Sequence, residues 1–340
     1  MKNQINTQDK LPKRYDITVS LVDKELTNIY GMRYAEYRRL YALAGEFKYE
    51  PDFPLYLMLE QTFSCNLKCP SCIHAYPAHK RKFNMDIRIM PLSIFERIIL
   101  EGEENKCPSI IFNVNDEPLL VKDLASRVKF AKDHGFMDLF ITTNGNLLNP
   151  VIMKSLVKSG ITRILFSIDA ATPQTYGKVR PGGNLSKVIS NLKALTEYKK
   201  NNKSVLPAIR VSFVANRLNM HEFRLFIQKF SGLADYLEVQ EFSTYYDAND
   251  ALIPEDATHT DNFYCTEPWR KLIIRANGDV LPCCTFYGYE IILGNILKSS
   301  LTELFNGRLC RQLRADFKEG KYKLKPCISC SRSFYKSRSV

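Results

Sequence analysis

The stretch CNLKCPSC, residues 65–72, follows an apolar run, LYLMLEQT, at residues 55–62. It places Cys65, Cys69 and Cys72 at spacings of three and two intervening residues. In a reducing compartment, cysteines at such short spacings are more typical of metal ligands than of disulfides. The stretch therefore predicts a metal site at the end of a buried strand.

Two kinds of metal site fit three clustered cysteines. In a four-iron iron–sulfur cluster each iron takes a ligand besides the bridging sulfides, so three thiolates leave one iron open. A zinc ion would need a fourth ligand, for which His74 and His79 are nearby candidates. The spacing favours the cluster and leaves zinc as the alternative.

The composition describes a globular chain of 340 residues, 45% of them hydrophobic, which is long enough for one large and one smaller domain. Its first residues, MKNQINTQDK, lack the apolar core of a secretory signal. No run of about 18 apolar residues is present, so we expect no membrane span. We therefore expect a cytoplasmic protein whose ten cysteines are reduced or bind metal.

Six apolar segments alternate with five amphipathic ones. The expected strands cover residues 55–62, 109–116, 138–145, 163–170, 208–216 and 236–243, and the expected helices cover residues 91–104, 123–135, 149–160, 184–202 and 220–230. Repeated βα units predict an α/β protein with a parallel sheet. A further helix is expected over residues 30–46, where Tyr34, Tyr37 and Tyr41 form a stripe that packs against the sheet.

Polar residues follow the expected strands and are predicted to converge, because chemistry in parallel βα folds collects at the carboxyl ends of the strands. They are NDEP at residues 115–118, TNG at 143–145, SIDA at 167–170, and Asn216. This edge also receives the cysteines of the opening stretch.

A second group of cysteines lies near the C-terminus. Cys265 and Cys283 have 17 residues between them, and Cys327 and Cys330 have two. The segment IIRANGDVLPC predicts a hairpin with a type I′ turn at residues 277–278, followed by a helical segment that leads back to the last pair. This arrangement predicts either a fully cysteine-ligated cluster or a zinc ribbon, and composition alone does not separate them.

The opening motif, placed after a strand and followed by five βα units, resembles the radical S-adenosylmethionine (SAM) superfamily over roughly residues 52–243. The resemblance implies a partial (β/α)6 barrel and a [4Fe–4S] cluster on Cys65, Cys69 and Cys72 whose open iron binds SAM. It also implies reductive cleavage of SAM to a 5′-deoxyadenosyl radical that abstracts hydrogen. An external one-electron reductant such as flavodoxin or ferredoxin would be needed.

The resemblance has departures. Ser71 stands where relatives often have an aromatic residue, and Asn115 and Asp116 replace two glycines of a Gly-Gly-Glu motif. A side chain then fills space that glycine leaves to the cofactor. The resemblance assigns the SAM amino group to Glu117 and the ribose to Ser167 and Asp169, although Asp169 could also cap a turn. Arg180 is a candidate partner of the SAM carboxylate, with an ordinary surface arginine as the alternative. The full predicted set for SAM is Asn115, Glu117, Asn144, Ser167, Asp169, Arg180 and Asn216.

GDVLPCC with a downstream CxxC resembles the SPASM and Twitch extensions of radical SAM enzymes. The resemblance implies one auxiliary [4Fe–4S] cluster on Cys265, Cys283, Cys327 and Cys330, and so two clusters in all. The pattern is similar to that of the 2-deoxy-scyllo-inosamine dehydrogenase family. The expected units are residues 1–51, an N-terminal extension; residues 52–245, the barrel; and residues 246–340, the auxiliary cluster domain.

Three cysteines remain. Cys107 and Cys310 are expected to pack in the core. Cys284, beside a predicted ligand, is the candidate catalytic thiol, which would return a hydrogen atom as in radical SAM epimerases; the alternative is a bystander. Four supplied ligands favour an electron-accepting cluster, hence oxidation over epimerisation.

We therefore expect an oxidoreductase or epimerase acting on a small polar substrate such as a sugar or aminocyclitol. Residues 298–340 carry eleven Lys or Arg against three Asp or Glu, which predicts either an anionic substrate or partner, or a solvated surface. The alternatives are a ribosomal-peptide maturase, for which 50 N-terminal residues leave little room for leader recognition, and a non-catalytic iron–sulfur sensor. The sequence has no dinucleotide-binding glycine motif, no G-x-S-x-G elbow and no phosphate loop, so other enzyme classes are not expected. It also lacks an RNA-binding signature, so we expect no nucleic acid partner.

Overall fold

The computed structural model describes residues 18–76, 83, 88–246, 248–260 and 263–337. His79, one of the two histidines considered as a zinc ligand, lies outside these residues.

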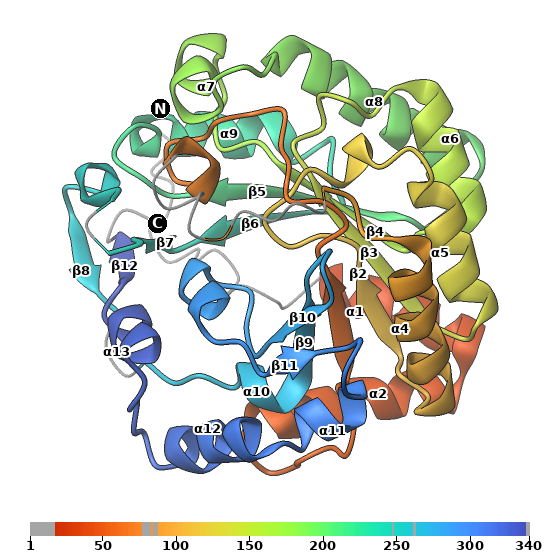
Figure 1. The fold of residues 1–340 in the computed structure, drawn as a ribbon. Coiled ribbons are helices and arrows are strands. Elements are labelled where there is room, and N and C mark those ends of the chain that lie inside the picture. The colour runs from red at the N-terminus through yellow and green to blue at the C-terminus, as the bar shows by residue number, and fades with distance from the viewer. Residues whose placement is uncertain (1–17, 77–82, 84–87, 247, 261–262, 338–340) are drawn as a thin grey trace.

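A nine-stranded sheet forms the centre of the protein, with strand order β11-β10-β9-β1-β2-β3-β4-β5-β6 (Figure 1). The strands are β1 (Tyr56–Leu59), β2 (Ser109–Ile111), β3 (Asp138–Thr143), β4 (Arg163–Ser167), β5 (Ala208–Val214), β6 (Tyr236–Gln240), β7 (Phe242–Ser243), β8 (Ala257–His259), β9 (Lys271–Ile274), β10 (Asp279–Leu281), β11 (Gly294–Asn295) and β12 (Phe334–Ser337). Neighbours from β1 to β6 pair in parallel. The predicted α/β class with a partial barrel is confirmed.

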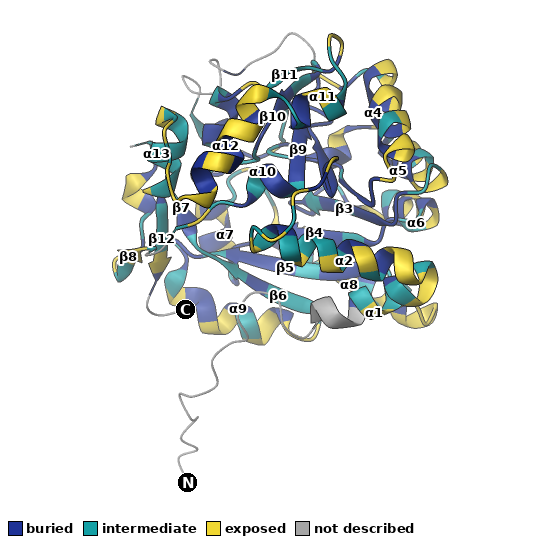
Figure 2. Cartoon of the chain, turned by 90° about the horizontal axis from the view of Figure 1, so that it is seen from below, coloured by how far each residue is buried: buried dark blue, intermediate teal, exposed yellow. Residues whose placement is uncertain are grey.

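Helices cover the outer face of this sheet, and their yellow solvent-facing sides contrast with the dark blue strands in Figure 2. The helices are α1 (Thr18–Tyr30), α2 (Met32–Gly45), α4 (Leu92–Glu104), α5 (Leu124–Asp133), α6 (Pro150–Ser159), α7 (Pro173–Val179), α8 (Leu185–Asn201), α9 (Phe223–Phe230), α10 (Glu267–Arg270), α11 (Leu301–Phe305), α12 (Arg308–Lys318) and α13 (Lys325–Ser331). The five predicted βα helices are α4, α5, α6, α8 and α9.

Local sequence explains where these helices begin and end. Asn149 caps α6 by accepting bonds from two backbone amides, Pro150 follows at the first helical position, and Gly160 ends the helix with φ 92°. In α4 the side chains of Phe95 and Ile98 are buried in the core between helix and sheet.

The predicted C-terminal hairpin continues the barrel sheet. Strand β9 pairs in parallel with β1, for example Leu57 with Leu272, and antiparallel with β10. The type I′ turn is wrong, because only Gly278 has positive φ, 88°. The amide of Gly278 donates to the carbonyl of Arg275, so residues 275–278 form a four-residue turn whose last residue is a left-handed glycine.

Helices α1 and α2 pack near the amino ends of the strands, and the sequence missed α1. The hydroxyl of Tyr34 donates to Asp23 at 2.8 Å, and Arg163 at the start of β4 pairs with both Asp23 and Asp138. Tyr34 and Tyr37 are buried, which confirms the predicted packing stripe. The N-terminal helices are therefore fixed to the barrel.

A second sheet has the order β7-β12-β8, so residues 242–243 pair with the C-terminal strand 334–337. The predicted boundary between residues 245 and 246 thus separates segments that share two sheets. In the described part of the chain, none of the helices has the length and apolar character to cross a bilayer.

Candidate functional site

The three cysteines of the opening stretch lie in the loop between β1 and the 3-10 turn Ile73–Ala75. The amide of Cys72 donates to the carbonyl of Cys69 at 2.9 Å, and the amide of Leu67 points at Sγ of Cys65 at 3.4 Å. Burial raises the pKa of Cys65 to about 11 and that of Cys72 to about 12, and the Cys69 thiol adds to both shifts electrostatically. The three sulfurs therefore share one loop and interact with one another.

Arg180, which ends α7, reaches this loop. Its Nη1 lies 3.5 Å from Sγ of Cys69, and its Nη2 pairs with the carboxylate of Asp169. Asp169 has φ 62°, a left-handed conformation that costs a non-glycine residue about 1 kcal/mol. Its other carboxylate oxygen accepts the amide of Val214 at 2.9 Å, which holds it in place.

Glu117 ties the loop after β2 to the end of β3. Its carboxylate accepts the hydroxyl of Thr143 at 2.7 Å and the amides of Asn144 and Leu119 at 2.8 and 3.2 Å. Burial raises its pKa to about 7 against these hydrogen bonds. Its predicted contact with SAM stays a prediction.

Asn115 and Asn144 connect the loops of this edge. The side-chain amide of Asn144 donates to Oδ1 of Asn66 in the cysteine loop at 2.9 Å. The carbonyl of Asn115 lies 2.7 Å from Nε2 of His74, and its side-chain amide lies 3.5 Å from the carbonyl of Cys284. Of the residues expected to converge near the cysteine loop, Asn115, Asn144 and Asp169 are connected to it by hydrogen bonds, Asp169 through Arg180.

The other two residues of the predicted SAM set are Ser167 and Asn216. Ser167 lies at the end of β4 and is half-buried. The side chain of Asn216 accepts the amide of Leu218 at 3.0 Å and donates to the carbonyl of Val214 at 3.0 Å. Asn216 is therefore engaged in its own turn.

The second cysteine group comes from three places in the chain. Cys265 precedes α10, Cys283 follows β10, and Cys327 and Cys330 lie on α13. Hydroxyl Oγ1 of Thr285 lies 3.5 Å from Sγ of Cys283 and 4.0 Å from Sγ of Cys330.

The same four thiols influence one another. Burial raises the pKa of Cys265, and nearby Glu267, Cys283 and Cys330 raise it further. Burial raises the pKa of Cys330 to about 12, and Cys327 adds to that shift. The fold thus places Cys265 and Cys283 near Cys330, and Cys327 lies one helical turn before Cys330 on α13.

Cys284 points to a different partner. Its Sγ lies 3.1 Å from Nζ of Lys271 and 4.0 Å from Oε2 of Glu267, and Lys271 and Glu267 form an ion pair. Lys271 is only 4% exposed. The spare thiol is therefore held by a buried ammonium group.

Cys107 and Cys310 are core thiols, as expected. Cys107 donates to the carbonyl of Pro54 at 3.3 Å, and Cys310 lies on the buried face of α12; both are at most 2% exposed.

The described cysteine groups do not have the close spacing of a single-ion site. Among the residues that the structure describes, no three Cys, His, Asp or Glu side chains come together closely enough to hold one metal ion. A four-iron cluster takes one thiolate on each iron, so its ligands need not meet at a point. His74, the described histidine considered for zinc, is bonded to Asn115 and packs against Phe63.

Comparison with known families agrees with this division. Residues 59–223 match the Radical SAM superfamily, and residues 265–331 match SPASM, an iron–sulfur cluster-binding domain. The chain thus contains a radical SAM domain followed by a SPASM domain, as the sequence resemblance predicted. These domains imply SAM and more than one [4Fe–4S] cluster as cofactors.

Two curated relatives show the range of similarity. A probable GTP 3′,8-cyclase from Methanocaldococcus jannaschii is 30% identical over 55% of this chain and 58% of its own length. A cofactor-modifying protein of tungsten-containing aldehyde ferredoxin oxidoreductase from Pyrococcus furiosus is 24% identical over 81% of this chain and 87% of its own. The chain spans 57–58% of the length of the first curated relatives.

Solved structures share the fold. SuiB of Streptococcus suis bound to S-adenosylmethionine gives a TM-score of 0.64 at 18% identity, covering 86% of this chain and 74% of that one. BtrN in complex with AdoMet and 2-DOIA gives 0.55 at 18% identity, covering 78% and 87%.

Sequence reasoning missed two charged residues of the β9 segment, Lys271, which contacts Cys284, and Arg275. Lys271 and Arg275 bracket the apolar strand β9, and Arg275 lies 3.4 Å from the buried Glu60. Alternate positions Leu272 and Ile274 pack in the main core, so Lys271 and Arg275 face the inside of the barrel. The sequence signal that could have found them is a charged residue at each end of an apolar stretch, residues 272–274, at positions that share one face of the strand.

Proposed function

We propose that the protein is a radical SAM oxidoreductase that oxidises a small polar substrate and holds two [4Fe–4S] clusters. The observation that supports this most is the placement of the two thiol groups. Three cysteines occupy a loop that Arg180 and Glu117 both contact, and two of the four others, Cys283 and Cys330, lie beside Thr285. Asn115 contacts both regions.

In this proposal Cys65, Cys69 and Cys72 hold the cluster that binds SAM, and Cys265, Cys283, Cys327 and Cys330 hold the auxiliary cluster. When bound, cluster and SAM supply a 5′-deoxyadenosyl radical that removes a hydrogen atom from the substrate, with the first electron coming from a flavodoxin or ferredoxin. A fully cysteine-ligated auxiliary site suits acceptance of the second electron, because it has no open position to engage substrate.

Charged residues on the inner face of the barrel support the proposal that the substrate is polar. Ile209 and Val211 of β5 pack into the main core, so Arg210 between them faces inward. Its Nη1 lies 3.2 Å from Oε2 of Glu238 on β6. Lys271 also faces inward. A lumen with these charged groups favours hydroxyl, amino or anionic groups over an apolar ligand.

The second candidate is maturation of a ribosomal peptide. It is favoured by the fold shared with SuiB bound to precursor peptide SuiA, at a TM-score of 0.60. Against it, α1 and α2 are packed on the barrel through Tyr34 and Arg163, so residues 18–45 are not available as a separate recognition unit.

Formation of 5′-deoxyadenosine tests the enzyme class. Reconstituted protein reduced with dithionite under argon should release 5′-deoxyadenosine from SAM, and a Cys69→Ala variant should release none. A Cys284→Ala variant should retain the activity, since Cys284 belongs to the other site. Wild-type protein that binds SAM without cleaving it would instead indicate a non-catalytic sensor.

A further inference from the structure

The basic C-terminal segment gathers around α13. Between residues 318 and 332 the chain has Lys318, Lys321, Lys323, Lys325 and Arg332 against a single acidic residue, Glu319. All five cationic side chains are exposed. These five exposed cationic residues define a basic surface of the folded protein, which we call the α13 surface.

Two of these cations are partly neutralised and three are not. Lys321 lies 2.6 Å from Glu319, and Lys323 lies 2.6 Å from Asp316. Lys318, Lys325 and Arg332 form no ion pair within the described residues. Since exposed pairs at a surface contribute little and are screened by salt, the α13 surface keeps a positive field.

Helix α13 also carries two of the four thiols of the auxiliary site. None of its residues is fully buried, whereas Cys69 of the first site is 5% exposed. Figure 2 shows α13 in the colours of intermediate and exposed residues at the rim of the molecule. Two ligands of the proposed auxiliary site therefore lie on a partly exposed helix, with Lys325 at its start and Arg332 directly after its end.

We propose that the α13 surface is the docking site of an acidic one-electron carrier protein that exchanges electrons with the auxiliary site. This rests on the proposed function, in which each oxidation leaves one electron there. The oxidised carrier takes up that electron and the site returns to its oxidised state; no bond or proton changes in this step. Weak, transient contacts steered by opposite charge are typical of electron-transfer partners.

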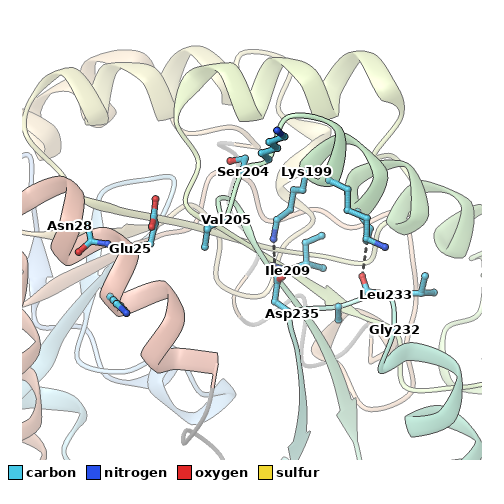
Figure 3. Close-up of a pocket in the computed structure, with 14 residues that line it drawn as sticks. Glu25, Asn28, Lys199, Ser204, Val205, Ile209, Gly232, Leu233 and Asp235 are labelled. Carbon is cyan, nitrogen blue, oxygen red and sulfur yellow. Dashed lines mark hydrogen bonds and ion pairs between the residues drawn. The ribbon is translucent and has the colours of Figure 1, made fainter.

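A second lysine-rich place in the protein lacks these properties. The groove in Figure 3 is lined by Lys199, Lys200 and Lys203. Lys199 is paired with Asp235, the groove also contains Glu25, and it lies by α1 and α8, away from α13 in both views of the fold. No cysteine lines it. It therefore provides a matched control for charge alone.

The test measures electron transfer with the reconstituted full-length enzyme. The auxiliary cluster is reduced with dithionite, excess reductant is removed, and the enzyme is mixed in a stopped flow with oxidised acidic plant-type [2Fe–2S] ferredoxin. Second-order rate constants are recorded from low to high ionic strength for wild type, for Lys325→Glu/Arg332→Glu, and for Lys200→Glu/Lys203→Glu. Benzoquinone, small and uncharged, reports any change in driving force, and iron is counted for every sample.

We expect the rate with ferredoxin to fall about tenfold or more in the α13 variant at low salt, and its salt dependence to flatten. The control variant should stay within about twofold of wild type, and the rate with benzoquinone should be the same for all three. Equal rates for wild type and the α13 variant, or an equal loss in the control, would overturn the docking site while leaving the proposed function intact. Wild type with only about four irons would overturn both, because no auxiliary cluster would exist.

Discussion

Arg180 joins Asp169 to Cys69: its Nη2 pairs with the carboxylate, and its Nη1 lies 3.5 Å from the sulfur. The guanidinium is largely shielded, with 14% of the side chain exposed, and permanently charged, so it is an N–H donor to a predicted cluster ligand under all ordinary conditions. Hydrogen bonds to cluster sulfurs and local charge are among the factors that set a cluster's reduction potential.

Replacing Arg180 should therefore lower the reduction potential of the first cluster. We expect Arg180→Gln to shift it downward by on the order of 50 mV, corresponding to a bond that differs by about 1 kcal/mol between the two oxidation states. Arg180→Lys, which keeps the charge, should shift it less. Redox titration followed by electron paramagnetic resonance, without SAM, measures this. An unchanged potential in the Gln variant would show that Arg180 has no influence on the cluster.

Gly288 gives Cys283 the space it needs. A Cβ at residue 288 would lie 2.6 Å from Sγ of Cys283 and would also collide with the carbonyl of Cys283. Gly288→Ala should displace this ligand, so the iron content should fall from about eight to about four atoms per chain. Gly232→Ala, where a Cβ meets nothing within 4 Å, is the control and should retain all iron. A full iron complement in Gly288→Ala would argue against Cys283 as a ligand.

The neighbouring cysteines 283 and 284 should behave differently. Cys283 shares Thr285 with Cys330, whereas Cys284 is held by Lys271. We predict that Cys283→Ala loses the auxiliary cluster and that Cys284→Ala keeps it. Once a substrate is known, unchanged oxidation by Cys284→Ala would identify this thiol as a bystander. If Cys284→Ala instead no longer places solvent-derived hydrogen in an epimeric product that the wild type makes, the enzyme is an epimerase.

Asp138 anchors the amino-terminal side of the barrel. Its carboxylate lies 2.8 Å from Nε of Arg163 and accepts the hydroxyl of Thr162 at 2.7 Å. Asp138→Asn should destabilise the protein by about 3 kcal/mol, because a buried charge is removed and Arg163 loses one of its two carboxylate partners. Urea unfolding followed by circular dichroism measures this. Asp133→Asn, which removes an exposed pair with Lys129, should cost less than about 1 kcal/mol.

The same carboxylate gives stability an acid dependence. Burial alone would raise the pKa of Asp138, but the charge and hydrogen bonds of Arg163 outweigh it and hold the pKa below its usual value. This contribution is present above the unfolded-state pKa of about 3.9 and is lost as the pH falls through the lower folded value. The stability difference between wild type and Asp138→Asn should therefore shrink as the pH falls below about 4. A difference that stays constant to pH 2 would contradict this.

Periodicity predicted most of the barrel, because buried parallel strands and amphipathic helices leave strong signals. All six strands were found, although β2 ends at Ile111, five residues before the predicted end, because NDEP forms the loop of the site. The pairing of β9 with β1 was not predictable, since the apolar run of β9 reads as a hairpin arm and parallel pairing across 200 residues has no local signature.

Spacing identified the thiols but not their surroundings. Cys265 and Cys330 are far apart in sequence; the expected hairpin and helix joined them as ligands of a cluster or of zinc, and the resemblance favoured the cluster. The contacts of Cys284 with Lys271 and of Arg180 with Cys69 depend on side-chain direction in the folded barrel, which local sequence does not encode.

Iron and zinc counting on anaerobically reconstituted protein tests the central claim most directly. Wild type should contain about eight irons, and either Cys65→Ala/Cys69→Ala/Cys72→Ala or Cys327→Ala/Cys330→Ala should contain about four. The first variant should also lose the spectral change on adding SAM, and the second should keep it. About four irons in wild type, or zinc in place of the second set, would contradict the account of two clusters.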